Sequence, residues 1–331
     1  YIVYTGAMKD ATMGDYTALH LRAMQLGIPC LTSLDTANAL TSMIKSRFSA
    51  GNTELVDINH MRTSHREIRF SKMQDCGNDY IFIENFDGSI TAPESLCVSL
   101  CDRHTGIGGD GIVLIERSDA ADAKMRSFNR DGSEGKMAGN NIRSVGKYLC
   151  DRGYVKDENI SVETASGVKK LRLFLRNGKV NSVSVDMGNV SFDPGSVPVI
   201  TAEPRLVNSP VTIGGTEYNV TVLSVGNPHC VIFSDEIDGL DLRVLGPKFE
   251  HADIFPDRVN TEFVRAVARN TLRVRVWERG IGETLACGTG ACAAVAAAVE
   301  NGLCGQGADV TVKLPGGDLT VNYRDGRVTL T

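Results

Sequence analysis

The stretch Cys287-Gly288-Thr289-Gly290-Ala291-Cys292 opens a run of small and apolar residues that continues to Val299. This run predicts a helix that is apolar on nearly every side, and such a helix needs cover from other elements all round. Exposing it would forfeit about 25 cal/mol for each Å² of apolar surface. Many strand-like segments flank this one helix, so we expect a sheet that wraps around it.

A second copy of this arrangement lies earlier in the chain. Ala138-Gly139-Asn140-Asn141 heads a helical stretch to Cys150, and Cys287 follows Ala138 by 149 residues. Gly226-Asn227, which precedes an apolar run, follows Gly77-Asn78 by the same 149 residues. Two unrelated motifs with one offset predict a duplicated domain. We expect an α+β fold of two pseudo-repeated halves, each a strongly curved mixed or antiparallel sheet around a central helix, with a cleft between them.

The composition predicts an ordinary soluble, cytoplasmic protein. The 331 residues are 42% apolar, which suffices for a sizeable core. A net charge of −5 with scattered Lys and Arg argues against nucleic acid as a partner, and no apolar run is long enough for a membrane span. The nine cysteines show no disulfide spacing, which suits a reducing compartment. Cys97 and Cys101 lack further ligands, so we interpret them as core residues and predict no metal.

The residues at the start of the apolar helix suit proton-transfer chemistry. A helix start leaves N–H groups unpaired and carries partial positive charge, which favours a thiolate and holds anions such as a carboxylate. Cys287 stands at this position, Gly288 leaves room for a ligand, and the Thr289 hydroxyl is a further donor. The alternative is a small buried cysteine that packs the helix. The earlier copy has Ala138 at the matching place, so the halves differ in chemistry.

Short polar motifs between residues 68 and 331 carry a resemblance to one family. They are Phe70-Ser71-Lys72-Met73, Gly77-Asn78-Asp79, Asp102-Arg103-His104, Phe128-Asn129, Asp131-Gly132-Ser133-Glu134, Gly226-Asn227-Pro228-His229-Cys230, Glu278-Arg279-Gly280, Gly282-Glu283-Thr284 and Leu314-Pro315-Gly316-Gly317. Together they resemble the signatures of diaminopimelate epimerases. The resemblance implies an isomerase of lysine and peptidoglycan-precursor biosynthesis that converts LL-diaminopimelate to the meso form with no pyridoxal phosphate or other cofactor. It also suggests a homodimer.

The same resemblance implies a role for each site residue. In that family one thiolate removes the α-proton and a thiol on the opposite face returns one. Cys287 matches one sulfur, Ala138 stands at the place of the other, and His229 and Glu278 match residues that tune the thiols. Alanine cannot transfer a proton, so we expect an impaired enzyme. The residues implied in substrate binding are Asn78, Asn129, Gly139, Asn140, Asn227, Asn260, Glu278, Arg279, Gly288 and Thr289.

The ends of the chain depart from this family. His20-Leu21-Arg22-Ala23-Met24 and the stretch from Gly27 to Ala37 resemble the allosteric domain that ends carbamoyl-phosphate synthase large chains. Only its last part is present, so we expect residues 1–48 to form a partial α/β segment without activity, as in a fragment of a fused reading frame. We expect a linker over 49–66 and epimerase halves over 67–190 and 191–331. The family pattern continues beyond Thr331 with another strand, so we also expect an unpaired sheet edge at the C-terminal end.

Other functions stay open at this stage. A non-catalytic diaminopimelate-binding protein would keep the binding residues and lose one thiol. Another racemase of the same fold, such as proline racemase, is disfavoured because Asn78, Asn129, Asn227 and Asn260 suit a second amino-acid head group better than a ring. An allosteric module of carbamoyl-phosphate synthase rests on residues 1–48 alone.

Overall fold

The computed structural model describes residues 2–3, 10–28, 30–31, 37–38, 41, 67–135 and 141–331. The chain divides into two compact units, residues 1–67 and 68–331. In the first unit, β1 (Ile2–Val3) pairs in parallel with β2 (Cys30–Leu31), and α1 spans Asp10–Gln25. The sequence predicts a helix over 17–26 here, and α1 begins seven residues earlier, at Asp10. The sequence also predicts a helix over 33–48, which lies almost entirely outside the described residues, as does the linker predicted over 49–66.

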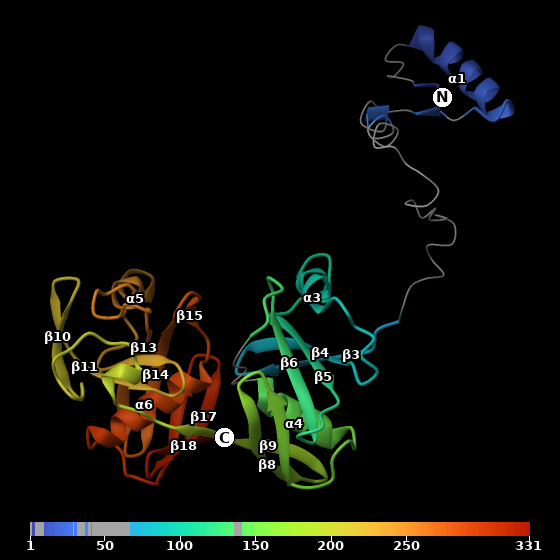
Figure 1. Ribbon diagram of the computed structural model, residues 1–331. Coiled ribbons are helices and arrows are strands. Elements are labelled where there is room, and N and C mark those ends of the chain that lie inside the picture. Colours follow the sequence, from blue (N-terminus) through green and yellow to red (C-terminus); the bar gives the residue numbers. More distant parts are fainter. Residues whose placement is uncertain are drawn as a thin grey trace. The chain divides into compact units, whose positions relative to one another are not determined.

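The second unit is built on one sheet of 16 strands, shown in Figure 1. The path runs β10-β11-β12-β13-β14-β16-β17-β18-β9-β8-β7-β6-β5-β4-β3, and β15 pairs with β14. The first half contains β3 (Phe70–Asp75), β4 (Asn78–Glu84), α3 (Pro93–Cys101), β5 (Gly111–Glu116), β6 (Ala123–Asn129), α4 (Asn141–Asp151), β7 (Asn159–Thr164), β8 (Gly167–Arg176) and β9 (Lys179–Asn189).

A short 3₁₀ turn, η1 (Pro194–Ser196), follows the first half. The second half contains β10 (Ser209–Ile213), β11 (Thr216–Ser224), β12 (Pro228–Phe233), α5 (Leu242–Glu250), β13 (Asn260–Ala268), β14 (Thr271–Glu278), β15 (Gly282–Thr284), α6 (Gly288–Glu300), β16 (Asp309–Leu314), β17 (Gly317–Arg324) and β18 (Arg327–Leu330).

The two halves repeat one pairing scheme. From β3 to β9 the successive pairs are antiparallel, parallel, antiparallel, parallel, antiparallel and antiparallel, and the pairs from β11 to β18 follow the same order. The register repeats too: Tyr80 faces Gly111, and His229 faces Asn260, each 149 positions later. The predicted pseudo-repeat is therefore confirmed.

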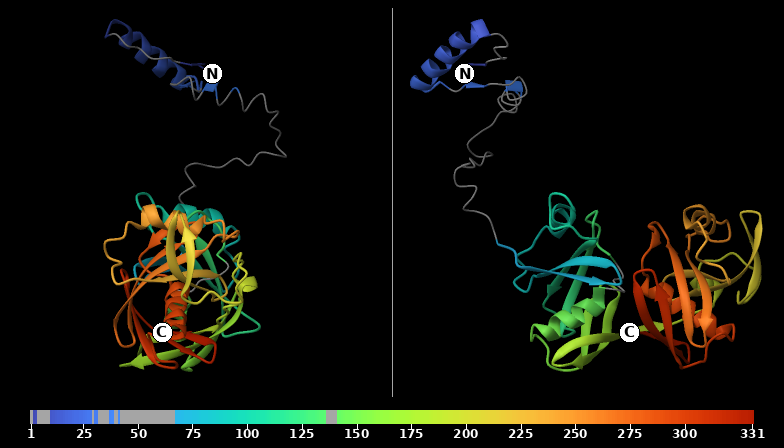
Figure 2. Two further views of the ribbon diagram at one scale, coloured as in Figure 1. Left: turned by 90° about the vertical axis from the view of Figure 1, so that its left-hand side faces the viewer. Right: turned by 180° about the vertical axis from the view of Figure 1, so that it is seen from behind.

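Each half encloses one helix, as the two views of Figure 2 show. Every residue of α6 from Gly288 to Ala298 is buried, because its alanines and glycines let strands approach on all sides. This confirms the prediction made from the apolar run. The helix α4 buries eight of its eleven residues in the first half. Cys97 and Cys101 are fully buried in a smaller core beneath α3, as expected for core residues.

One expectation about the sheet is wrong. We expected an unpaired edge at the C-terminal end, but the last strand, β18, pairs with β17 on one side and with β9 on the other. The β9–β18 pair joins the sheets of the two halves, and it leaves β3 and β10 as the edges. The second partner of β18 is β9, the last strand of the first half.

Candidate active site

A cleft of about 860 Å³ lies between the two halves of the second unit. Its volume is within the range typical of sites for small molecules. The first half contributes Gly77, Asn78, Tyr80, Arg103, Asp110, Ser127, Asn129, Arg130, Asp131, Gly135 and Asn141, and the second half contributes Asn227, Glu278, Ile281, Glu283, Thr284, Leu285, Ala286, Cys287, Gly288 and Thr289. Among these are residues from both copies of the repeated motifs, so the cleft predicted between the halves is present.

Cys287 is the N-cap residue of α6. Its backbone is extended, and its Sγ accepts a hydrogen bond from the backbone N–H of Gly290 at 3.4 Å. The Thr289 Oγ1 lies 3.4 Å from the same sulfur. An N-cap side chain normally satisfies one of the free N–H groups of the first helical turn. Here that acceptor is a sulfur in the wall of a cleft, where it can also meet a ligand.

The charge state of Cys287 differs from the expectation of a favoured thiolate. Burial raises the pKa of its thiol well above the ordinary value, and the nearby Glu278 and Glu262 carboxyls raise it further. The bonds from Thr289 and Gly290 lower this pKa, as a helix start should, but they do not outweigh burial. The sequence identified the stabilising donors correctly and missed the desolvation that opposes them.

His229 lies on β12. Its ring is fully buried, with Nδ1 2.7 Å from Glu262 Oε1 and Nε2 3.0 Å from Asn227 Oδ1. The Asn227 Nδ2 donates to Thr289 Oγ1 at 3.3 Å. His229 thus reaches Cys287 through Asn227 and Thr289 and not by direct contact.

Glu278 ends β14 and faces the cleft from the second half. The Thr284 hydroxyl donates to its Oε1 at 2.6 Å. This carboxyl is close enough to Cys287 to raise the pKa of the thiol. A carboxylate in this place disfavours a negative charge on the nearby sulfur. It suits a bound ammonium group.

The wall from the first half carries groups of both charges. Asn78 Nδ2 donates to Asp110 Oδ2 at 3.2 Å, and Arg103 binds Asp110 Oδ1 at 2.9 Å. Arg103 also binds Asp79, so the guanidinium lowers the pKa of that carboxyl to about 2. Asn129 donates to Ser133 Oγ at 3.0 Å from the end of β6. Amides, a guanidinium and carboxyls together can hold a zwitterionic group.

Two residues implied in binding lie outside the cleft wall. Asn260 is buried, its Nδ2 donates to the carbonyl of Pro228 at 2.7 Å, and its Oδ1 accepts from the N–H of Arg279 at 3.0 Å. The exposed guanidinium of Arg279 donates to the carbonyl of Asp257 at 2.9 Å. In this structure both side chains fasten loops that flank the cleft.

Three predicted positions, Ala138, Gly139 and Asn140, lie outside the described residues. Cys76 precedes the Gly77-Asn78 motif and is the nearest candidate in the sequence to replace the missing thiol. It stands in the turn between β3 and β4 with its Sγ close to Gly317, and it is not part of the cleft wall. Burial and Asp75 raise the pKa of Cys76 to about 11.

The sequence analysis missed several residues of the wall. Tyr80, Asp110, Ser127 and Asn141 line the cleft although none was predicted to do so. The repeat offers a signal for two of them, because Tyr80 and Asn141 stand 149 positions before His229 and Gly290. Applying the offset to every residue near a motif would have found both.

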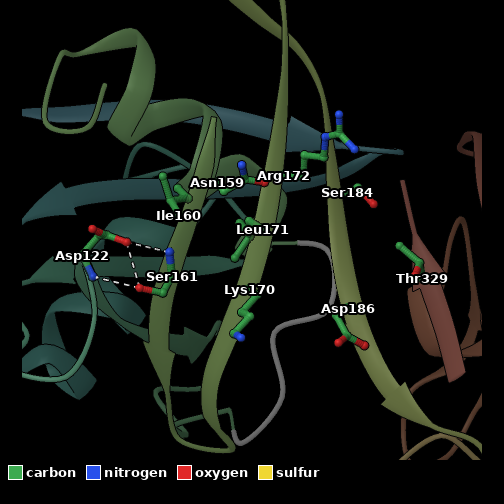
Figure 3. A pocket seen from close by; sticks show the side chains of 10 residues that line it. All are labelled: Asp122, Asn159, Ile160, Ser161, Lys170, Leu171, Arg172, Ser184, Asp186 and Thr329. Carbon is green, nitrogen blue, oxygen red and sulfur yellow. Dashed lines mark hydrogen bonds between the residues drawn. The ribbon is translucent and has the colours of Figure 1, made fainter. Parts of the chain in front are cut away.

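A second hollow, of about 450 Å³, lies over β7, β8 and β9 and reaches Thr329 of β18 (Figure 3). Eight of the ten residues that line it are polar or charged types, and Asp122 Oδ2 accepts hydrogen bonds from the backbone N–H and the hydroxyl of Ser161. None of the predicted site residues lines it. The larger cleft is therefore the candidate site.

Within the described ranges, no three His, Cys, Asp or Glu residues gather as a metal site would require. None of the helices seen there has both the length and the apolar character needed to cross a membrane.

Comparison with known proteins agrees with the geometry. The family model described as diaminopimelate epimerase matches residues 70–192 and 221–329. The chain is 49% identical over 262 residues to a diaminopimelate epimerase of Desulfovibrio desulfuricans, covering 77% of this chain and 91% of that protein. It is 48% identical over 258 residues to one of Acetivibrio thermocellus, covering 78% and 91%.

Among solved structures, a hydroxyproline epimerase from Agrobacterium vitis is similar with a TM-score of 0.53 at 17% identity, covering 80% of this chain and 88% of that one. At this identity the likeness concerns the fold alone. The length and identity of the matches to its relatives carry the assignment: this chain belongs to the diaminopimelate epimerase family of isomerases.

Proposed function

We propose that this chain binds diaminopimelate in the cleft and performs proton transfer at the α-carbon from one face only, through Cys287. The observation that carries the proposal is the position of Cys287, an N-cap thiol with two donors in a cleft that both halves line. The family supports the substrate, because its members act on diaminopimelate by name.

The proposed step uses groups of the cleft in sequence. The Cys287 thiolate takes the α-proton and becomes a thiol, and the electron pair left on carbon spreads into the adjacent carboxylate. The N–H groups at the start of α6 and the Thr289 hydroxyl stabilise this negative charge. The S–H hydrogen then exchanges with solvent, and the same thiol returns a solvent-derived proton to the same face. The α-centre exchanges its hydrogen with retention, and no cofactor takes part in the step.

Inversion needs a proton donor on the opposite face. We propose that the epimerases of this family place a thiol there and that Ala138 leaves the position without one. One general acid or base contributes about 10²- to 10⁴-fold to a rate, and here the missing group is an obligatory partner. We therefore expect inversion to fall by at least that factor.

The wall of the first half supports a substrate with two amino-acid ends. Asn78 and Asn129 supply amides, Arg103 and Arg130 supply positive charge, and Asp110 lies beside them. A distal ammonium and carboxylate together require donors and acceptors of both charges. A single ring such as proline has no second ammonium and carboxylate to meet these groups.

A second candidate, binding without catalysis, is favoured by Ala138 itself. Proton NMR in D₂O separates the two. We expect one isomer of diaminopimelate to lose its α-proton signal with retention in the presence of this chain, and no loss with Cys287→Ser. Saturable binding of both isomers by calorimetry, without any α-proton exchange, would replace the proposed half-reaction with a binding role.

A further inference from the structure

Glu262 is a buried carboxyl that the proton transfer described above does not use. It lies on β13, and neither its side chain nor that of its partner His229 is exposed to solvent. Glu262 Oε1 is 2.7 Å from His229 Nδ1, while its Oε2 has no hydrogen-bond partner among the described residues. Burying a carboxyl costs on the order of several kcal/mol of desolvation free energy. We therefore expect Glu262 to have a function that explains why it is kept there.

A chain of four contacts leads from this carboxyl to the reacting sulfur. After Glu262 and His229 come Asn227, at 3.0 Å from Nε2, then Thr289, at 3.3 Å from the Asn227 amide, and finally Cys287, whose Sγ is 3.4 Å from the Thr289 hydroxyl.

The donors along the chain all point the same way. The Asn227 Nδ2 donates to Thr289 Oγ1, so the one hydroxyl proton of Thr289 is free to donate to a Cys287 thiolate. The Asn227 Oδ1 is then an acceptor, so His229 Nε2 must carry a hydrogen. Hydrogen bonds aligned in one direction polarise one another and strengthen the last bond of the row.

The contact with Glu262 decides whether Nε2 carries that hydrogen. A protonated Glu262 donates to Nδ1 of a neutral ring, and an ionised Glu262 accepts from Nδ1 of a charged one. Both states keep the hydrogen on Nε2. An ionised Glu262 that accepts from Nδ1 of a neutral ring would leave Nε2 without a hydrogen, and two acceptors would then face each other across the 3.0 Å contact between Nε2 and Asn227 Oδ1. Burial raises the pKa of Glu262.

We propose that Glu262 is a positioning residue for Cys287. It fixes the ring of His229 with Nε2–H toward Asn227, so that every bond in the row donates toward the sulfur and stabilises its thiolate. The start of α6 is seated against it, since a Cβ at Gly290 would lie 2.8 Å from Glu262 Oε1. The inference rests on the proposed function only in taking Cys287 as the reacting sulfur.

Other ionisable groups act on the same sulfur. Glu278, at the end of β14, lines the cleft with Cys287 and opposes the thiolate, and Glu262 acts on the same sulfur from β13, where it is paired with His229 of β12. The net effect of Glu262 therefore has two parts: its bond to His229 helps the thiolate, and any negative charge on it would hinder it. Substitutions that keep the bond and remove the charge separate these parts.

The test measures the reactivity of Cys287 without substrate. The full chain is alkylated with iodoacetamide over a range of pH, and the peptide that contains residue 287 is quantified by mass spectrometry. We expect Glu262→Leu to slow alkylation about tenfold at a fixed pH near neutral, the effect of a rise of about one unit in the thiol pKa. Glu262→Gln, whose amide N–H can still donate to Nδ1, should keep most of the rate.

Two controls separate positioning from general damage to the fold. Thr261→Val changes the buried neighbour of Glu262 on β13, whose Oγ1 lacks a partner in the described part of the chain, and should leave the rate unchanged. In a His229→Gln background, Glu262→Leu should add nothing, because both act along one row. Thiolate absorbance, compared with matched Cys287→Ser variants, gives the same pKa without any reagent.

Three results would overturn the proposal: an unchanged rate in Glu262→Leu, an equal loss in Glu262→Gln, or additive losses with His229→Gln. If diaminopimelate showed no α-proton exchange, the alkylation results would still be valid, because alkylation does not involve the substrate. The two proposals therefore fail separately.

Discussion

Gly316→Ala should separate the two walls of the cleft. Gly316 lies in the turn between β16 and β17, where its N–H donates to the carbonyl of Leu285 at 2.8 Å. A Cβ at Gly316 would lie 1.9 Å from the carbonyl oxygen of Cys76, in the turn of the other half that carries Gly77 and Asn78. The backbone of Gly316 does not have a positive φ, so alanine is excluded by this contact and not by conformation.

The size of the effect follows from that distance. Real Cβ atoms do not approach another heavy atom within 3.0 Å, so the two turns must move apart by about 1 Å or more. Overpacking of this kind costs about 1–3 kcal/mol of stability. A displacement of about 1 Å in a catalytic site lowers rates by about 10²-fold. We expect both losses, because Gly77, Asn78 and Leu285 all line the cleft.

Urea unfolding and α-proton exchange in D₂O measure these losses on the same protein. Gly305→Ala is the matched control, because its Cβ would meet nothing nearer than 3.6 Å and its backbone φ is not positive either. Equal stability and equal exchange in the Gly316→Ala and Gly305→Ala variants would refute the contact between the two turns.

Three further predictions concern buried charge. The free energy of unfolding should fall as pH rises above about 9, the ordinary pKa of a thiol. Burial raises the pKa of Cys76 to about 11 and those of Cys101 and Cys292 to about 12. Above about pH 9 the folded chain therefore keeps protons that the unfolded chain releases. A urea midpoint that rises between about pH 8 and pH 10 would contradict this sign. Asp75→Asn should cost about 3 kcal/mol, because it leaves Arg143, only 7% exposed, without its 2.7 Å ion pair, whereas Asp186→Asn at the exposed pair with Arg327 should cost less than about 1 kcal/mol. Equal urea midpoints for these two variants would count against the buried pair. Glu278→Gln should speed the alkylation of Cys287, since the Glu278 charge raises the pKa of that thiol, and a slower reaction would show that another effect dominates.

The repeat and its central helices were predictable from the sequence, because they rest on strong local signals. The alanine-rich run of α6 has one physical solution, burial on all sides, and the offset of 149 residues places the second copy. Elements without such a signal were harder to predict, and two examples lie in the second half. The helix α5 contains Gly246 and Pro247, which normally interrupt helices, and β10 contains Pro210.

The site was predictable where residue type alone fixes the chemistry. Cys287 and Thr289 follow from the helix start, and Asn78, Asn129 and Asn227 lie on the cleft as the family resemblance implies. Glu262 escaped, because an acidic residue is normally solvated, and here the fold buries the first five residues of β13 in succession. The raised pKa of Cys287 escaped for the same reason, since desolvation depends on contacts between distant strands.

The central claim is that Ala138 limits this chain to proton transfer on one face, and the Ala138→Cys variant tests it most directly. LL- and meso-diaminopimelate are incubated in D₂O with this chain and with Ala138→Cys, and the α-proton and the configuration of the product are followed by NMR and chiral analysis. We expect this chain to exchange the proton of one isomer with retention and Ala138→Cys to interconvert the isomers. Inversion by the unchanged chain at the rate of Ala138→Cys would contradict the one-face mechanism.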